Sequence, residues 1–168
     1  VFGAFIGRLG FYWDDWAHIW WGQIGGAKCI IDNCQDDRLF LGYVISILYK
    51  TVGFNPLILH ALATIVSCVG GLLVFMIQQI TWPHARIYNL VVSIIFMLFP
   101  GFSLHFVTMV KLTIYFSMVL ELLSIYLFLV FIVNDKVIFK VLFLCISIFT
   151  GIIAWLIYEG SFFMEPIR

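Results

Sequence analysis

The chain has 168 residues, of which 64% are hydrophobic and 11% are charged, and its mean hydropathy is +1.11. These values exclude an ordinary soluble domain and predict a protein of the lipid bilayer. The formal net charge is zero and no basic tail or charge block occurs, which excludes nucleic acid as a partner.

The first apolar run, residues 1–12, contains Arg8 as its only charge but is too short to cross a membrane. A helix needs roughly 20 residues to span about 30 Å of hydrocarbon. Residues 1–12 are therefore expected to be a partial first span or an interfacial segment. Because the chain begins with Val1 inside this run and stops soon after its last apolar stretch, we expect a fragment of a longer protein.

Four longer apolar stretches predict membrane-spanning helices. No Asp, Glu, Lys or Arg occurs between Lys50 and Arg86. Pro100-Gly101 interrupts the next uncharged stretch, so a helix is expected to end near Phe99. The expected spans cover residues 57–80, 87–99, 112–133 and 138–158. The predicted fold class is therefore all-α, a polytopic transmembrane helical bundle that forms a single domain over residues 1–168.

The short loops between these spans set an orientation. One side receives four basic residues with Asp135 as its only acid, namely His84, Arg86, Lys136 and Lys140, whereas the other side receives Lys28, Arg38 and Lys111. The positive-inside rule makes that side cytoplasmic. The extracytoplasmic side then receives nearly all the remaining acids, namely Asp14, Asp15, Asp32, Asp36, Asp37, Glu159 and Glu165. We therefore expect an integral membrane protein with an extracytoplasmic active face.

In this topology residues 13–56 form a long first extracytoplasmic loop that is too apolar to be simply solvated. Trp13, Trp16 and Trp20 have the spacing of one helical face, which is typical of a helix in the headgroup region. The stretch 39–52 would be about 21 Å long as a helix, too short to span the membrane. The loop is therefore expected to contain interfacial helices. An aromatic belt without further role explains the tryptophans equally well.

The densest acidic group is Trp13-Asp14-Asp15-Trp16-Ala17-His18. A carboxylate at the edge of the hydrocarbon, beside a like-charged neighbour, is suited to act as a general base. Two solvated aspartates, or a helix cap formed by one of them, are the alternative. His18 follows Asp14 by four residues and Asp15 by three, so the three side chains can meet on one helical turn. There they would orient a base or hold a divalent cation such as Mg²⁺ or Mn²⁺.

Two cations are candidates for contacts with a phosphate. Arg38 follows Asp36-Asp37, and a guanidinium held by carboxylates can bind phosphate through two hydrogen bonds. A local ion pair at the start of the next helix is an equally good explanation. Lys111 lies near the outer end of its span, where it either meets a phosphate or extends to the membrane interface.

Two glutamates form a second candidate acidic site. Glu121 stands near the middle of an otherwise uncharged span, so it is expected to face the bundle interior, in a functional or a structural role. Glu159 follows the last span on the outer side and is a candidate for the same extracytoplasmic cavity as Asp14.

The acidic motif in residues 11–18, the later Asp37-Arg38-Leu39 and Phe99-Pro100-Gly101-Phe102 together resemble the N-terminal part of bacterial C-type (GT-C) membrane glycosyltransferases. The resemblance implies transfer of a sugar from a polyprenyl-phosphate donor to a glycan or lipid acceptor, at the outer face of the bacterial inner membrane. By position it makes Asp14 the candidate base and Asp15 its partner. By analogy it makes Arg38 a phosphate contact. The further candidates for substrate or phosphate binding are Asp37, His18 and Lys111.

Two other functions fit the same sequence. In a transporter or flippase, Glu121 and the outer carboxylates would line a substrate path. In a non-catalytic scaffold, the aromatic surface would bind partner helices. Transporters concentrate ionisable residues near the midplane of the membrane, whereas one of the nine acids is central here. This distribution favours glycosyl transfer.

Overall fold

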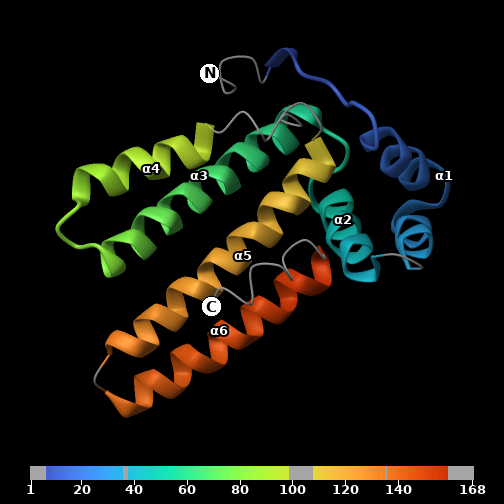
Figure 1. Cartoon of the computed structure of the whole chain (residues 1–168). Helices are drawn as coiled ribbons and strands as arrows, with labels where there is room; N and C mark the ends of the chain where they lie inside the picture. Colours follow the sequence, from blue (N-terminus) through green and yellow to red (C-terminus); the bar gives the residue numbers. More distant parts are fainter. Residues whose placement is uncertain (1–6, 36–37, 99–107, 135, 159–168) are drawn as a thin grey trace.

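The computed structural model describes residues 7–35, 38–98, 108–134 and 136–158. Over these residues the protein is all-α, which confirms that part of the predicted fold class (Figure 1). The six helices are α1 (Asp15–Cys34), α2 (Leu39–Val52), α3 (Pro56–Thr81), α4 (Arg86–Leu98), α5 (Thr108–Val133) and α6 (Val137–Ile157).

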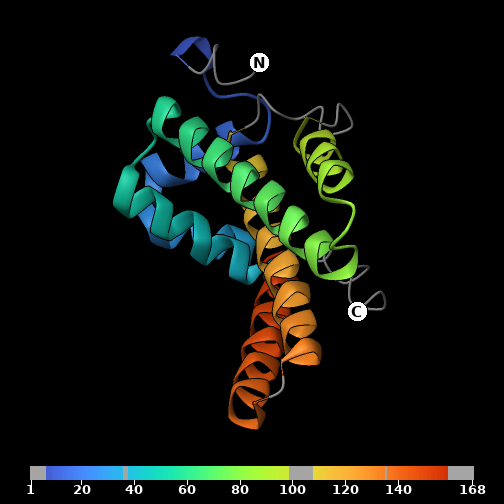
Figure 2. The ribbon, with the colours of Figure 1, turned by 90° about the vertical axis from the view of Figure 1, so that its left-hand side faces the viewer.

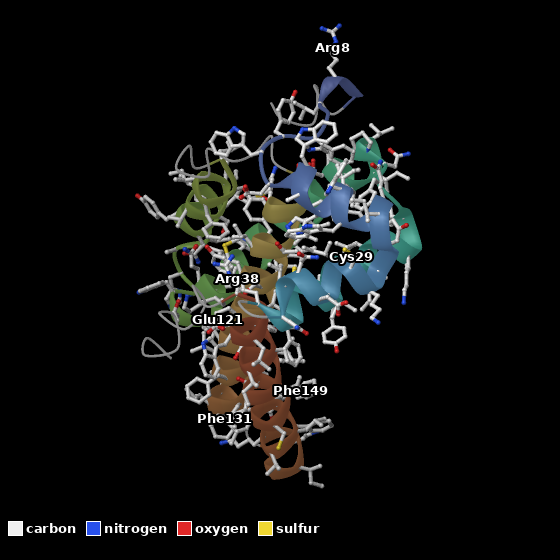
Figure 3. The ribbon with its side chains drawn as sticks, turned by 90° about the vertical axis from the view of Figure 1, so that its right-hand side faces the viewer. Arg8, Cys29, Arg38, Glu121, Phe131 and Phe149 are labelled. Carbon is white, nitrogen blue, oxygen red and sulfur yellow. The ribbon has the colours of Figure 1, made fainter. Side chains whose placement is uncertain are left out.

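Three of the helices are long and apolar enough to cross a membrane. The qualifying segments are Pro56–Thr81, Lys111–Val133 and Ile138–Ile157, in α3, α5 and α6. Residues in a helix rise about 1.5 Å each, so all three exceed or match a hydrocarbon core of about 30 Å. Their outer surfaces carry large exposed apolar side chains such as Phe149 (Figure 3). This arrangement is consistent with an integral membrane protein in contact with lipid.

The fourth apolar helix is short. The described residues of α4 number 13, so this part of the helix is about 20 Å long, less than the thickness of the hydrocarbon. The structure thus describes three candidate spans where the sequence led us to expect four complete ones. Pro100-Gly101, expected to form the turn after this helix, lies outside the described residues.

The expected long loop contains α1 and α2. α2 covers the same residues, 39–52, as the predicted apolar stretch. α1 bends at Gly26, whose φ of 63° is a backbone conformation that glycine adopts without steric cost. Trp16 and Trp20 of α1 are exposed, as is Trp13 just before it. Residues 9–12 precede α1 without α-helical structure, and residues 1–6 of the expected partial span lie outside the described part of the chain.

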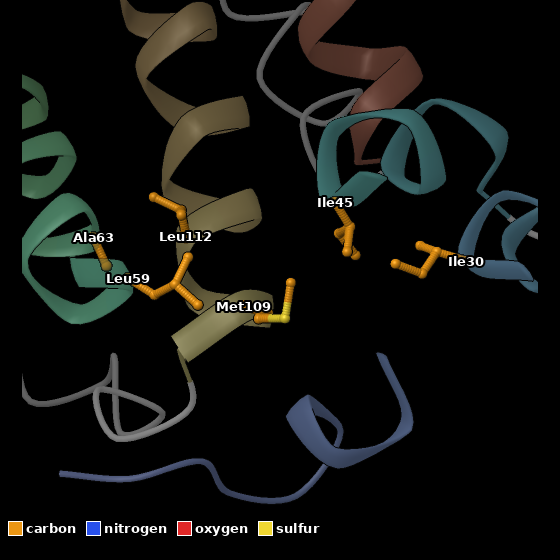
Figure 4. Packing of buried hydrophobic residues seen from close by; sticks show 6 residues of the cluster. All are labelled: Ile30, Ile45, Leu59, Ala63, Met109 and Leu112. Carbon is orange, nitrogen blue, oxygen red and sulfur yellow. The ribbon is translucent and has the colours of Figure 1, made fainter. Parts of the chain in front are cut away.

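The long helices form a bundle with α1 and α2 gathered at one end. α5 and α6 pair as a hairpin, α3 packs along α5, and α4 folds back along α3 (Figures 1 and 2). α1 and α2 lie beside each other near the start of α5. A buried apolar cluster joins α1, α2, α3 and α5 there (Figure 4), formed by Ile30, Ile45, Leu59, Ala63, Met109 and Leu112.

Hydroxyl groups join α5 to α6 within the apolar part of the bundle. The Ser124 hydroxyl donates to the backbone carbonyl of Ser147, and the Ser147 hydroxyl donates to that of Ser124, both at 2.7 Å. Nearer the end where α1 lies, the Ser117 hydroxyl donates to the Ala154 carbonyl at 2.8 Å. Small side chains let the two backbones approach, and hydrogen bonds between helices stabilise bundles in a solvent without water.

Glycines allow α3 to pack closely against its two neighbours. A Cβ at Gly70 would lie 3.4 Å from the Val119 side chain of α5. A Cβ at Gly71 would collide with the Met97 side chain of α4. The pair therefore sets the close approach of three helices.

Replacing Ser147 by Ala should remove one hydrogen bond between α5 and α6 while it leaves the packing volume almost unchanged. Hydrogen bonds between membrane helices contribute about 0.6 kcal/mol on average and up to about 1.7 kcal/mol, so the free energy of unfolding should fall by that amount. Cys145→Ala, at an exposed position of the same helix, is the matched control. Unfolding in mixed detergent micelles measures both variants. Equal effects of the two changes would contradict the assigned role of Ser147.

Candidate functional site

Asp15 holds the first turn of α5. Its side chain is completely buried, and its two carboxylate oxygens accept 2.7 Å hydrogen bonds from the backbone N–H groups of Thr108 and Met109. The first N–H groups of a helix have no partner within the helix and carry partial positive charge. A buried carboxylate accepts hydrogen bonds from these N–H groups and balances their partial positive charge. Asp15 is therefore a helix cap supplied from a distant part of the chain.

A second contact joins α3 to the same place. His60 of α3 is buried, and its Nε2 lies 3.0 Å from the Thr108 hydroxyl and 3.0 Å from the Gly10 carbonyl oxygen. The backbone N–H of Tyr12 also approaches Asp15 Oδ2, at 3.4 Å. The segment before α1, the start of α3 and the start of α5 therefore meet at one polar junction.

This geometry differs from the catalytic role expected for Asp15. Its carboxylate faces the backbone of α5, where both oxygens are occupied. Among the described residues, no three His, Cys, Asp or Glu side chains form a group that could hold a metal ion. Asp15 is turned toward α5, so in the described part of the chain Asp14, Asp15 and His18 do not gather into such a group.

Asp14, His18 and Arg38 line one cavity of about 280 Å³. The cavity lies between α1, the start of α2, the first turns of α5 and the end of α6. Asp14 is exposed and directly follows Trp13, whose φ of 49° is uncommon for a residue with a side chain. The other lining residues are Ala17, Trp21, Asn33, Cys34, Leu41, Thr113, Ile114 and Tyr158.

The His18 imidazole is buried in the wall of this cavity. Its side chain is 8% exposed, and its ring lies edge-on to that of Trp21, with 5.2 Å between centroids. No residue that the structure describes makes a hydrogen bond to His18 Nδ1. Burial lowers the pKa of His18, and the charges of Asp15 and Asp14 oppose this effect. The lowered pKa favours the neutral form of the ring.

The guanidinium of Arg38 lies against an aromatic ring. Its central carbon is 5.1 Å from the centroid of the Tyr158 ring, the geometry of a cation–π contact. Arg38 immediately precedes α2, and Tyr158 immediately follows α6. This contact places a positive charge where the ends of two helices meet the cavity.

The other expected site residues lie elsewhere. Lys111 is buried on α5, with its Nζ 5.3 Å from the centre of the Tyr115 ring, and it is not among the described residues that line the cavity. Glu121 is 1% exposed on α5, in agreement with the expected interior position. Asp37 and Glu159 lie outside the described residues.

Several residues of the site and its junction were not identified from the sequence. The position of Tyr158 could have been predicted, because this residue follows the last apolar stretch on the side of the membrane expected to hold the first loop. Thr113 and Asn33 line the cavity because of how the helices pack. The identity of a single residue does not predict such packing. His60 reads as one polar residue in a long apolar helix, and only its contact with Thr108 gives it a role.

Replacing Asp15 by Ala should destabilise the protein by about 3 kcal/mol, because two buried N–H groups lose a charged acceptor. Asp14→Ala is the matched control: Asp14 is exposed, so its removal should change the free energy of unfolding by less than about 0.5 kcal/mol. Chemical denaturation of the purified protein in detergent measures both variants. Equal losses in the two variants would contradict the capping role.

The lowered pKa of His18 predicts that stability falls in mild acid. Below the unfolded-state pKa of about 6.5, the unfolded chain binds a proton that the folded chain resists, so protonation favours unfolding. Between pH 7.5 and 5.5 the melting temperature should fall more for the wild type than for His18→Leu, which cannot be protonated there. Parallel curves for the two proteins would show that His18 is not the responsible group.

No protein-family model, curated protein sequence or solved structure matches this chain. The ground for a functional assignment is therefore the cavity itself. It combines an exposed carboxylate, an imidazole, a guanidinium and two aromatic rings in one space.

Proposed function

We propose that the protein is a bacterial membrane glycosyltransferase, or a part of one, which transfers a sugar from a polyprenyl-phosphate donor to an extracytoplasmic acceptor. The observation that carries the proposal is that Asp14 and Arg38, which come from separate segments, line the same cavity. Glycosyl transfer from a lipid phosphate requires a group that takes a proton from the acceptor and a cation that stabilises the departing phosphate. The cavity offers one of each.

Asp14 is the residue suited to activate the acceptor. Its carboxylate is exposed at the cavity, whereas the neighbouring Asp15 is buried and occupied by the backbone of α5. Asp14 would take the proton of the acceptor hydroxyl as its oxygen forms a bond to the anomeric carbon of the sugar. The bond from that carbon to the phosphate oxygen breaks at the same time.

Arg38 is the residue suited to the leaving group. The phosphate that departs keeps the electron pair of the broken bond, and a planar guanidinium can bind two of its oxygens at once. The ring of Tyr158 supports the guanidinium from one face. Lys111 lies apart from the cavity lining, so the phosphate contact is assigned to Arg38 alone.

The position of the cavity suits a substrate that resides in the membrane. Trp13, Trp16 and Trp20 are exposed beside the cavity residues of α1. Tryptophans of this kind favour the boundary between hydrocarbon and headgroups. A polyprenyl phosphate carries its charged group at the same boundary, so donor and cavity would meet at one depth.

The second candidate function is that of a transporter or flippase, and Glu121 is the residue that supports it. It is a buried acid midway along α5, a candidate span (Figure 3). Ionisable residues in such positions commonly mark ion or substrate paths. In that case Glu121→Gln would abolish substrate movement, and Asp14→Asn would leave it unchanged.

Asp14→Asn should lower sugar transfer by at least about 100-fold, because the amide cannot accept the proton of the acceptor. The assay follows labelled sugar from a panel of polyprenyl-phosphate donors, in membranes that contain equal amounts of the full-length wild-type or variant protein. Asp32→Asn, at an exposed position of α1 outside the cavity lining, is the matched control and should retain activity. Full activity of Asp14→Asn would contradict the proposed base. Failure of the wild type with every donor would contradict the enzyme class.

A further inference from the structure

A second cavity, of about 290 Å³, lies where α2, α3 and α5 meet, and the proposed reaction does not use it. We call it the apolar cavity because all the described side chains that line it are apolar. They are Val44, Ile47 and Leu48 of α2, Leu62 and Val66 of α3, and Leu112 and Phe116 of α5. In folded proteins an apolar cavity of roughly 150 Å³ stays dry and binds small hydrocarbons. The apolar cavity is therefore suited to a hydrocarbon ligand.

The apolar cavity has a buried floor and an open rim. Leu112 is 5% exposed and belongs to the buried cluster that joins four helices, against which Leu62 and Val66 also pack (Figure 4). At the rim, Ile47 is 60% exposed and Phe116 is 37% exposed. The space therefore opens on the outer surface of the bundle, where the candidate spans present apolar side chains to lipid.

The apolar cavity lies at the depth of the hydrocarbon, close to one boundary. Leu62 follows Pro56, where the candidate span in α3 begins, by six positions, or about 9 Å along the helix. Phe116 follows Lys111, where the candidate span in α5 begins, by five positions, or about 8 Å. A phospholipid has its acyl chains at this depth and its phosphate nearer the water.

A cation lies beside the rim. Lys50 is exposed in the last turn of α2, three positions after Ile47, and residues three apart on a helix share a face. Lys50 also precedes Pro56 by only six positions, so it lies near the boundary of the hydrocarbon. No Asp or Glu occurs between Asp37 and Glu121, so neither α2 nor α3 carries a carboxylate that could neutralise Lys50. The positive charge favours a lipid with an anionic head group.

The apolar cavity is distinct from the cavity that Asp14 and Arg38 line. The two cavities share no lining residue among those that the structure describes. Arg38 and Lys50 lie at opposite ends of α2, twelve positions or about 18 Å apart along the helix. A single lipid phosphate therefore cannot contact both cations, and each cavity has a cation of its own.

We propose that the apolar cavity binds one acyl chain of an anionic phospholipid, with the phosphate of that lipid beside Lys50. The chain fills the space between α2 and the two spans, and so holds α2 against the bundle. A ligand that binds only the folded protein raises its stability, so the phospholipid acts as a structural partner. This inference does not depend on the proposed glycosyl transfer.

The test uses the full-length protein in nanodiscs of phosphatidylcholine that contain a small fraction of phosphatidylglycerol with a photoreactive diazirine on one acyl chain. Mass spectrometry locates the labelled residues. Segments 44–48, 62–66 and 112–116 should carry several times more label than segment 138–149 of α6, which has many exposed apolar side chains. Labelling of the three lining segments no stronger than that of segment 138–149 would overturn the proposal.

A variant that fills the apolar cavity tests where the acyl chain lies. Val66→Phe places a ring in the space, so labelling of segments 44–48 and 112–116 should fall on the order of tenfold. Val69→Phe makes the same change at an exposed position of α3, outside the described lining, and should leave the labelling unchanged. Equal labelling of the two variants would overturn the assigned position of the chain.

A change at an exposed residue, which preserves the packing of the helices, tests the head group. The lining segments of the wild type should react more with photoreactive phosphatidylglycerol than with photoreactive phosphatidylcholine that has identical chains. Lys50→Gln should reduce this preference about fivefold, the effect of one lysine near an anionic lipid surface. Lys28→Gln, at an exposed position of α1, should keep it. Equal labelling of the wild type by the two lipids would overturn the role of Lys50.

Competition separates this ligand from the proposed sugar donor. Unlabelled phosphatidylglycerol should displace the photoreactive lipid from the lining segments, whereas decaprenyl phosphate at the same mole fraction should not. Displacement by decaprenyl phosphate would assign the apolar cavity to the chain of the donor and would overturn the phospholipid assignment. The roles proposed for Asp14 and Arg38 would stand in either case, because they concern the other cavity.

Discussion

The carboxylate of Asp15 binds the backbone N–H groups that open α5, from 93 and 94 positions earlier in the chain. The burial of a carboxylate is costly unless its oxygens are hydrogen-bonded, and the start of a helix provides donors with partial positive charge. This contact fixes α1 against the end of the bundle. Successive residues near a helix start point in different directions, so Asp14, one position earlier, is left at the cavity with Arg38.

The wall of the cavity opposite α1 depends on the pairing of α5 with α6. The Ser117 hydroxyl binds the Ala154 carbonyl, and the cavity residues Thr113 and Tyr158 each lie four positions, about one helical turn, from this bond. Backbone and side-chain polar groups in a membrane must find partners within the protein. The hydrogen bonds that join the two spans therefore also set the distance between the residues that face the cavity.

The sequence predicted the long apolar helices because hydrocarbon thickness imposes their length, and α2 because its apolar stretch has clear ends. α4 agrees closely with the predicted range 87–99, and at 13 residues both are shorter than a span. The acidic motif and Arg38 were identified as site residues, yet the motif alone could not show which aspartate faces the cavity. That distinction depends on Thr108 and Met109, which carry no local signal of contact with Asp15.

The different positions of the two neighbouring aspartates are tested most directly by carboxylate labelling of the folded protein. A water-soluble carbodiimide with an amine nucleophile modifies accessible carboxylates, and mass spectrometry of the peptide that contains both residues locates the label. Asp14, which is exposed, should be modified rapidly, and Asp15, which is fully buried, should react only after unfolding. Modification of Asp15 in the folded protein at the rate of Asp14 would contradict the cap, and with it the assignment of Asp14 to the cavity.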